Sequence, residues 1–195
     1  PLYDYLQQLF AQVTNPPLDA IREELITAVC TTVGAEGNLL DPRPESCRQV
    51  HLPHPVLTED QMAALIGIDG PGGPDGFTSR VLDGLYEVSR GGEGLADALD
   101  RLRAEASAAI HDGVTLLVIS DRGTSPALAP VPSLLATGAV HHHLIREKTR
   151  TRVGLLVESG DVREVHHVAL LLGYGASAVC PYLTFDSVDD MVRDG

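Results

Sequence analysis

Charged side chains follow two apolar segments in the second half of the chain. Asp121 and Arg122 come after the run at 114–119, and Glu158 follows the run at 153–157. If both runs are parallel strands, these side chains meet at the edge of the sheet where α/β proteins place their sites. Two carboxylates there could serve as general acid and base. The same residues could instead cap and pair locally, which is the simpler interpretation, or contact a partner domain.

Two runs of adjacent histidines raise the question of a metal site. Neighbouring helix residues point about 100° apart, so three histidines in a row cannot bind one ion. Glu164 and His167 have the i, i+3 spacing of carboxylate-bridged metal sites in helical bundles, and His143 with Glu147 is the only rough second copy. Burial or contact with a partner domain is the simpler role for His143 and His167.

The three cysteines, Cys30, Cys47 and Cys180, are odd in number and form no C-x-x-C pair. This spacing argues against both a disulfide framework and a zinc ribbon. We therefore expect reduced thiols in a cytoplasmic protein, with no metal or cofactor held by these residues.

Two glycine-rich segments resemble ligand-binding loops in composition alone. Residues 173–178 match G-x-G-x-x-A, but they follow a predicted helix and precede a predicted strand, the reverse of the dinucleotide-binding order. They predict a helix end and a tight turn. Residues 91–94 predict a turn before a helix and are a weak candidate for anion binding.

The elements that would position these residues alternate regularly after residue 76. Apolar runs predict strands at 79–85, 114–119, 153–157 and 178–180, and helical spacing predicts helices at about 95–111, 133–149, 162–172 and from about 186. Alternation of this kind is typical of βα units on a parallel sheet. Four units make an open sheet or half of a barrel. The expected fold class is therefore α/β.

The first 76 residues follow a different plan. Residues 1–67 predict an arm: a short helix that ends at 14–17, a helix from Asp19 to Val33, extended chain at 37–57 because of its prolines, and a short helix after the capping box Thr58–Gln61. Residues 68–76 are a Gly/Pro loop. Residues 77–195 form the βα-repeat domain.

The chain is acidic, with 14 basic and 27 acidic residues, a net charge of −13 and a pI near 4.8. Such a charge disfavours nucleic acid and anionic membranes as partners. We interpret the densest basic stretch, from Arg146 to Arg152, as cations that offset the dipole at the C-terminus of a helix. Because residue 1 is Pro and the chain stops within a helical pattern, we expect a piece of a longer protein.

Several long motifs resemble the central domain of the glutamate synthase large subunit, and the resemblance spans nearly the whole chain except the Gly/Pro loop. They are PLYDY (1–5), FAQVTNPPLD (10–19), GNLLDP (37–42), ESC (45–47), SDR (120–122), AVHHHLIR (139–146), VREVHH (162–167) and LGYGA (172–176).

The resemblance implies a fold and a setting. The domain would be a partial, degenerate relative of the FMN-binding TIM barrel, without catalytic residues or cofactors of its own. In the parent chain it would join a glutamine amidotransferase domain to an FMN and iron–sulfur synthase domain. The whole enzyme hydrolyses glutamine, passes ammonia through a tunnel and adds it reductively to 2-oxoglutarate. A small NADPH-oxidising subunit would be a further partner through the holoenzyme.

The resemblance also gives a role to the turn at Thr14 and Asn15, which lies near the tunnel entrance in this family. A hydroxyl and an amide can hydrogen-bond neutral ammonia without protonating it. The alternative is that these residues simply close a helix before Pro16. The leading hypothesis is thus a scaffold, and its rival is a free-standing enzyme or anion-binding module that uses the strand-end residues.

Overall fold

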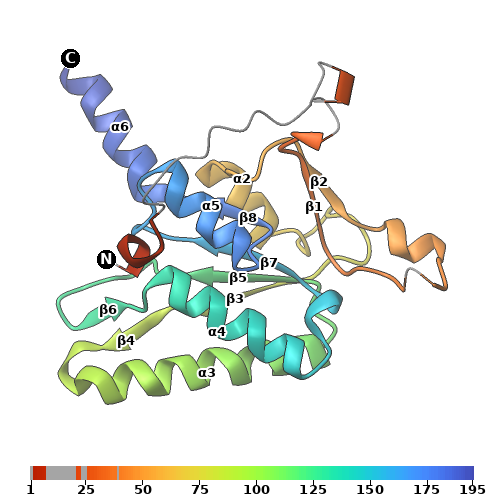
Figure 1. Ribbon diagram of the computed structural model, residues 1–195, viewed down its shortest axis with the longest axis horizontal. Helices are drawn as coiled ribbons and strands as arrows, with labels where there is room; N and C mark the ends of the chain where they lie inside the picture. The colour runs from red at the N-terminus through yellow and green to blue at the C-terminus, as the bar shows by residue number, and fades with distance from the viewer. Residues whose placement is uncertain (1, 8–20, 23–25, 39) are drawn as a thin grey trace.

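A parallel sheet of four strands lies at the centre of the computed structural model, which describes residues 2–7, 21–22, 26–38 and 40–195 (Figure 1). The strands follow in the order β3–β5–β7–β8, so each new strand is added beside the previous one. Their bounds are β3 Ser79–Asp83, β5 Leu116–Ser120, β7 Gly154–Glu158 and β8 Ala178–Cys180. The predicted α/β class and all four parallel strands are confirmed.

Three helices follow the strands and cover one face of this sheet. Leu82, Leu117 and Leu155 pack against α3 and α4, and Val157 and Val179 pack in one cluster with α5. The helices are α3 (Gly91–His111), α4 (Ser133–Arg146) and α5 (Val165–Gly173). Crossovers that all lie on one face are typical of βα barrels, whereas doubly wound sheets have helices on both faces. The sheet stays open in the part of the chain that the structure describes, so the fold is a partial barrel.

The opposite face, which would be the interior of a closed barrel, is covered by the first part of the chain. Leu116, Val118 and Leu156 on that face belong to one buried cluster with Val33 and Met62. The covering elements are the antiparallel ribbon of β1 (Thr31–Val33) and β2 (Val50–Leu52) and the helix α2 (Glu59–Ile66).

Helix α2 begins at the predicted capping box. The Thr58 hydroxyl accepts from the Gln61 backbone N–H at 3.3 Å, and the Gln61 side chain accepts from the Thr58 N–H at 3.0 Å. Just before it, the Leu57 N–H donates to the Val179 carbonyl at 2.8 Å. The approach to α2 is therefore fixed to the outer edge of the sheet.

The structure corrects three predictions. Val33 ends a strand, not a helix, because Thr31, Thr32 and Val33 are β-branched and pair with β2. Gly91 and Gly92 begin α3 instead of forming a turn before it. The last helix, α6 (Tyr182–Asp194), starts four residues earlier than expected. The sequence also gave no sign of the antiparallel pair β4 (Leu85–Glu87) and β6 (Leu128–Pro130).

Short 3₁₀ turns complete the described elements: η1 Leu2–Leu6, η2 Pro44–Cys47, η3 Val88–Arg90 and η4 Arg150–Arg152. Among the described residues, no helix is both long enough and apolar enough to cross a bilayer.

Candidate functional site at the strand ends

Arg122 binds two carboxylates from different parts of the chain. Its Nε donates to Glu158 Oε1 at 2.6 Å, and its Nη2 contacts Glu59 at the start of α2. Glu158 is 6% exposed, and its second oxygen accepts from the Ser120 hydroxyl at 2.6 Å. Burial alone would lower the pKa of Arg122. Glu158 and Glu59 outweigh this effect through their hydrogen bonds and their negative charges, and they raise the pKa of Arg122 above its ordinary value. The register that aligns Ser120 with Glu158 produces this cluster.

Asp121 makes a separate set of contacts. Its carboxyl group accepts from the Gly160 backbone N–H at 3.0 Å, lies 2.7 Å from the Ser159 hydroxyl and hydrogen-bonds the Tyr182 hydroxyl. Asp121 is 6% exposed, and this burial raises the pKa of its carboxyl above the usual range. The structure thus brings Asp121, Arg122 and Glu158 to one edge of the sheet but gives the two carboxylates different partners.

The contacts of Asp121 continue away from the strand ends toward η1. Ser159 also contacts Asp161 at 2.8 Å, Asp161 accepts from the Ser133 hydroxyl at 2.6 Å, and Ser133 lies 2.6 Å from the Tyr3 hydroxyl. Sequence reasoning missed these four residues, because single serines, a tyrosine and an aspartate carry no motif.

His167 belongs to the same region. Its ring stacks on Tyr3 with centroids 4.0 Å apart. Its Nδ1 accepts from the Arg163 backbone N–H at 3.1 Å, so Nε2 carries the proton and faces Glu164 at 3.2 Å. Two protein groups therefore already engage the two ring nitrogens.

His143 lies at a different place, between α3 and α4. Its Nε2 is 2.8 Å from the Ser107 hydroxyl and 3.4 Å from Glu147, and Ser107 donates to Glu147 at 2.6 Å. The structure thus contains both His–Glu pairs, His143 with Glu147 and His167 with Glu164, but they lie at different places and contact different partners. Among the described residues, no group of three or more His, Cys, Asp or Glu could hold a metal ion.

Arg150, from the basic stretch, has a structural role that the sequence did not predict. Its guanidinium donates to the carbonyls of Val153 at 2.7 Å and Gly175 at 2.6 Å, and to His141 Nδ1 at 3.0 Å. Burial lowers the pKa of Arg150 from its ordinary value. The side chain ties the start of β7 to the turn before β8. Gly175 has φ +109° in that turn, in agreement with the predicted helix end.

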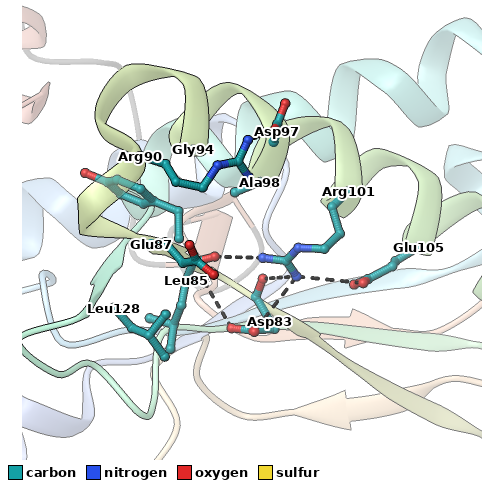
Figure 2. A pocket seen from close by; sticks show the side chains of 11 residues that line it. Asp83, Leu85, Glu87, Arg90, Gly94, Asp97, Ala98, Arg101, Glu105 and Leu128 are labelled. Carbon is teal, nitrogen blue, oxygen red and sulfur yellow. Dashed lines mark hydrogen bonds and ion pairs between the residues drawn. The ribbon is translucent and has the colours of Figure 1, made fainter.

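A groove of about 610 Å³ lies on the outside of the molecule between α3 and the β4–β6 pair (Figure 2). Figure 2 shows Arg101 reaching across it, where its guanidinium donates to the carbonyls of Asp83 at 2.9 Å and Leu85 at 2.7 Å. Arg101 also lies within ion-pair distance of Glu105. These contacts hold α3 against the β3–β4 connection.

The whole chain matches one protein family. The model of the glutamate synthase central domain covers residues 1–195. The chain belongs to this family. It is 45% identical over 192 residues to the glutamate synthase [NADH] of Schizosaccharomyces pombe, and 45% identical over 194 residues to the glutamate synthase [NADPH] large chain of Bacillus subtilis. It is 41% identical over 191 residues to the ferredoxin-dependent glutamate synthase 2 of a Synechocystis strain.

These alignments cover 98%, 100% and 96% of this glutamate synthase central domain, but only 9%, 12% and 12% of the relatives. The domain thus spans about a tenth of the curated relatives it matches.

The cysteines of this central domain do not fit an iron–sulfur cluster, which needs several thiolates around one centre. Cys30 and Cys47 are exposed, whereas Cys180 is buried in the sheet. Burial raises the pKa of the Cys180 thiol to about 12. Thr14 and Asn15, the candidate tunnel residues, lie outside the described part of the domain.

Proposed function

We propose that this domain is a non-catalytic scaffold within glutamate synthase. It links the glutamine amidotransferase domain to the FMN-binding synthase domain and helps to form the ammonia tunnel between them. The parent enzyme converts glutamine, 2-oxoglutarate and a reductant into two molecules of glutamate. Membership of the family and the small share of the relatives that the domain covers support this role.

One observation carries the proposal: the charged side chains at the strand ends, where a βα barrel keeps its site, are bound by other groups of the domain. The interior face of the sheet is also covered by the domain's own chain. Val33 and Met62, from β1 and α2, are almost fully buried against the interior face of the sheet. At the strand ends, the guanidinium of Arg122 is held by Glu158 and Glu59. Side chains that neutralise one another inside the domain suit a rigid support better than a reaction centre. We propose residues 1–67 as an arm, of which β1, β2 and α2 cover this face, followed by the loop 68–76 and the βα domain 77–195.

The linking role needs surface that other domains can cover. Helix α6 projects from the body (Figure 1) and contains no buried residue. Val188, Met191 and Val192 on this helix are 50%, 73% and 75% exposed. Exposed apolar side chains clustered on one element are typical of interaction surfaces. We assign them, with the amidotransferase or FMN-binding domain as partner, to the interdomain contacts of the parent chain.

Cofactors and the electron donor belong to the rest of the enzyme in this proposal. FMN and the iron–sulfur cluster would be bound by the synthase domain. Relatives named for NADH, NADPH and ferredoxin are 45%, 45% and 41% identical to this domain. Because this similarity hardly varies with the donor, we infer that donor choice is set elsewhere, for example by the small NADPH-oxidising subunit. The exposed thiols of Cys30 and Cys47 suit the reducing conditions of the cytoplasm.

The tunnel role rests on Thr14 and Asn15, whose hydroxyl and amide would guide neutral ammonia. The test is the full-length enzyme with Thr14→Val and Asn15→Ala. We expect the yield to fall from two glutamates per glutamine hydrolysed toward one, because ammonia would escape before it reaches 2-oxoglutarate. The control is Thr151→Val, the same chemical change at an exposed position in η4. An unchanged ratio of glutamine consumed to glutamate formed would remove these residues from the tunnel. They would then simply close the turn before Pro16.

A further inference from the structure

A continuous chain of short polar contacts runs from the end of β5 to η1. Asp121 Oδ2 lies 2.7 Å from the Ser159 hydroxyl, which lies 2.8 Å from Asp161 Oδ1. The same Asp161 oxygen lies 2.6 Å from the Ser133 hydroxyl, and Ser133 lies 2.6 Å from the Tyr3 hydroxyl. Two carboxyl groups and three hydroxyl groups thus share four contacts of 2.6–2.8 Å, and the Tyr3 hydroxyl also lies 3.4 Å from the same Asp161 oxygen.

The number of protons in this chain does not match the number of contacts. Each hydroxyl supplies one proton, so Tyr3, Ser133 and Ser159 can donate three of the four hydrogen bonds. Ser159 is the point of conflict, because its single proton can face Asp121 or Asp161 but not both. If both carboxyls were ionised, the remaining contact would set a hydroxyl lone pair against a negative oxygen. A fourth proton removes the conflict.

We propose that Asp121 holds this proton and donates it to Ser159, so that the chain of hydrogen bonds fixes η1 to the strand ends as a pH-sensitive latch. The direction of donation is then Asp121 to Ser159, Ser159 to Asp161, Ser133 to Asp161, and Tyr3 to Ser133. Every oxygen in the chain has a partner, and only Asp161 is charged.

Burial decides which carboxyl is neutral. Asp121 is 6% exposed, whereas Asp161 is only half-buried. Asp161 also accepts the Ser133 backbone N–H at 3.2 Å, in addition to two hydroxyl protons. Burial is the main reason that the pKa of Asp121 is raised. Its hydrogen bonds with Ser159, Tyr182 and Gly160 reduce this rise, and the negative charge of Asp161 adds to it. A proton is therefore held more firmly on Asp121 in the folded state than in an open one.

The other titratable groups around the latch either bind protein partners or line a neighbouring cavity. Tyr182 hydrogen-bonds Asp121, and Arg122 is bound by Glu158 and Glu59. Arg163 and His167 line a cavity of about 230 Å³ beside Tyr3 and Asp161. His167 is stacked on Tyr3, so the experiment needs a variant that keeps an aromatic ring at this position but has no ionisable group.

The sign of the pH effect follows from linkage. Because the pKa of Asp121 is raised in the closed state, the latch is most stable at pH values below the ordinary Asp pKa and weakens as pH rises through the raised pKa. Between those two values the equilibrium constant for opening η1 rises by about tenfold per pH unit, and above them it levels off.

The experiment measures hydrogen exchange of residues 2–6 from about pH 4 to pH 9 in the 195-residue chain, corrected for the intrinsic exchange rate. We expect protection to fall over the window just described. Asp121→Asn should abolish this fall, because its amide group donates to Ser159 at every pH. His167→Phe should leave the fall in place, which excludes His167 as its source. Asp161→Asn removes the charged acceptor and should reduce protection throughout.

A vibrational spectrum provides the second readout, because the band of the unaltered chain can be recorded without any variant and is then assigned with variants that fold. The unaltered chain should show the C=O stretch of a buried carboxylic acid, and Asp121→Asn should lose it. A flat exchange profile, a profile flattened by His167→Phe, or a carboxylic-acid band that survives Asp121→Asn and is lost in Asp161→Asn would each overturn the proposal.

Discussion

The guanidinium carbon of Arg122 lies 4.1 Å from the centre of the Tyr182 ring. This cation–π contact joins the end of β5 to the first residue of α6, and the same guanidinium binds Glu158 on β7. One side chain thus contacts both the strand ends and the start of α6. If α6 is an interdomain element, Arg122 acts on the partner domain through the position of this helix.

Removal of Arg122 should destabilise the domain. Arg122→Ala leaves the carboxylate of Glu158 buried without its cation, and we expect a loss of about 2–4 kcal/mol in the free energy of unfolding. Arg152→Ala is the matched control, because Arg152 is exposed. We expect it to change stability by no more than about 0.5 kcal/mol. Urea denaturation of both variants checks the prediction, and equal midpoints would contradict it.

Gly154 is needed where the arm meets the sheet. A Cβ atom at this position would lie 2.5 Å from Val33 Cγ1 and 2.9 Å from the Gly34 nitrogen. We therefore expect Gly154→Ala to cost about 1–3 kcal/mol of stability and to increase proteolysis of the arm. Gly92→Ala is the control, because its Cβ would meet no atom within 4 Å and should be neutral or stabilising. Equal resistance to protease in the two variants would count against the close packing.

The three cysteines should differ in reactivity. Thiol reagents attack the thiolate, and burial raises the pKa of Cys180 to about 12, whereas Cys30 and Cys47 are exposed. We expect a disulfide reagent at about pH 8 to modify two thiols in the folded chain and the third only after denaturation. Rapid modification of all three under native conditions would show that Cys180 is accessible.

His141 should make the domain sensitive to mild acid. Burial and then the charge of Arg150 lower the pKa of His141, whose Nδ1 accepts from Arg150. Its contribution to stability is therefore present above the ordinary His pKa of about 6.5 and is lost as pH falls from there through the folded value. His141→Gln keeps an acceptor for Arg150 and should remove this part of the acid sensitivity, as measured by thermal unfolding from about pH 8 to pH 5. A Gln variant with the same pH profile would contradict the assignment.

The parallel strands were predictable because β5 and β7 are buried along their whole length and therefore read as unbroken apolar runs. It was also predictable that Asp121, Arg122 and Glu158 lie close together, because the carboxyl ends of neighbouring parallel strands meet at one edge of the sheet. Strand β1 was not predictable, because three residues form it only by pairing with β2 about twenty positions later. The contact between Tyr3 and Asp161 joins residues 158 positions apart, and their residue types reveal nothing about it.

The most direct test of the scaffold role uses the full-length enzyme with Asp121→Asn, Arg122→Lys and Glu158→Gln introduced one at a time. Two partial reactions are measured apart: glutamine hydrolysis, and glutamate formation from added ammonia. If the strand-end residues only support the structure, each folded variant should keep kcat of both reactions within about threefold of the parent enzyme. A loss of about a hundredfold or more in either reaction by a correctly folded variant would show that this domain contributes a catalytic residue.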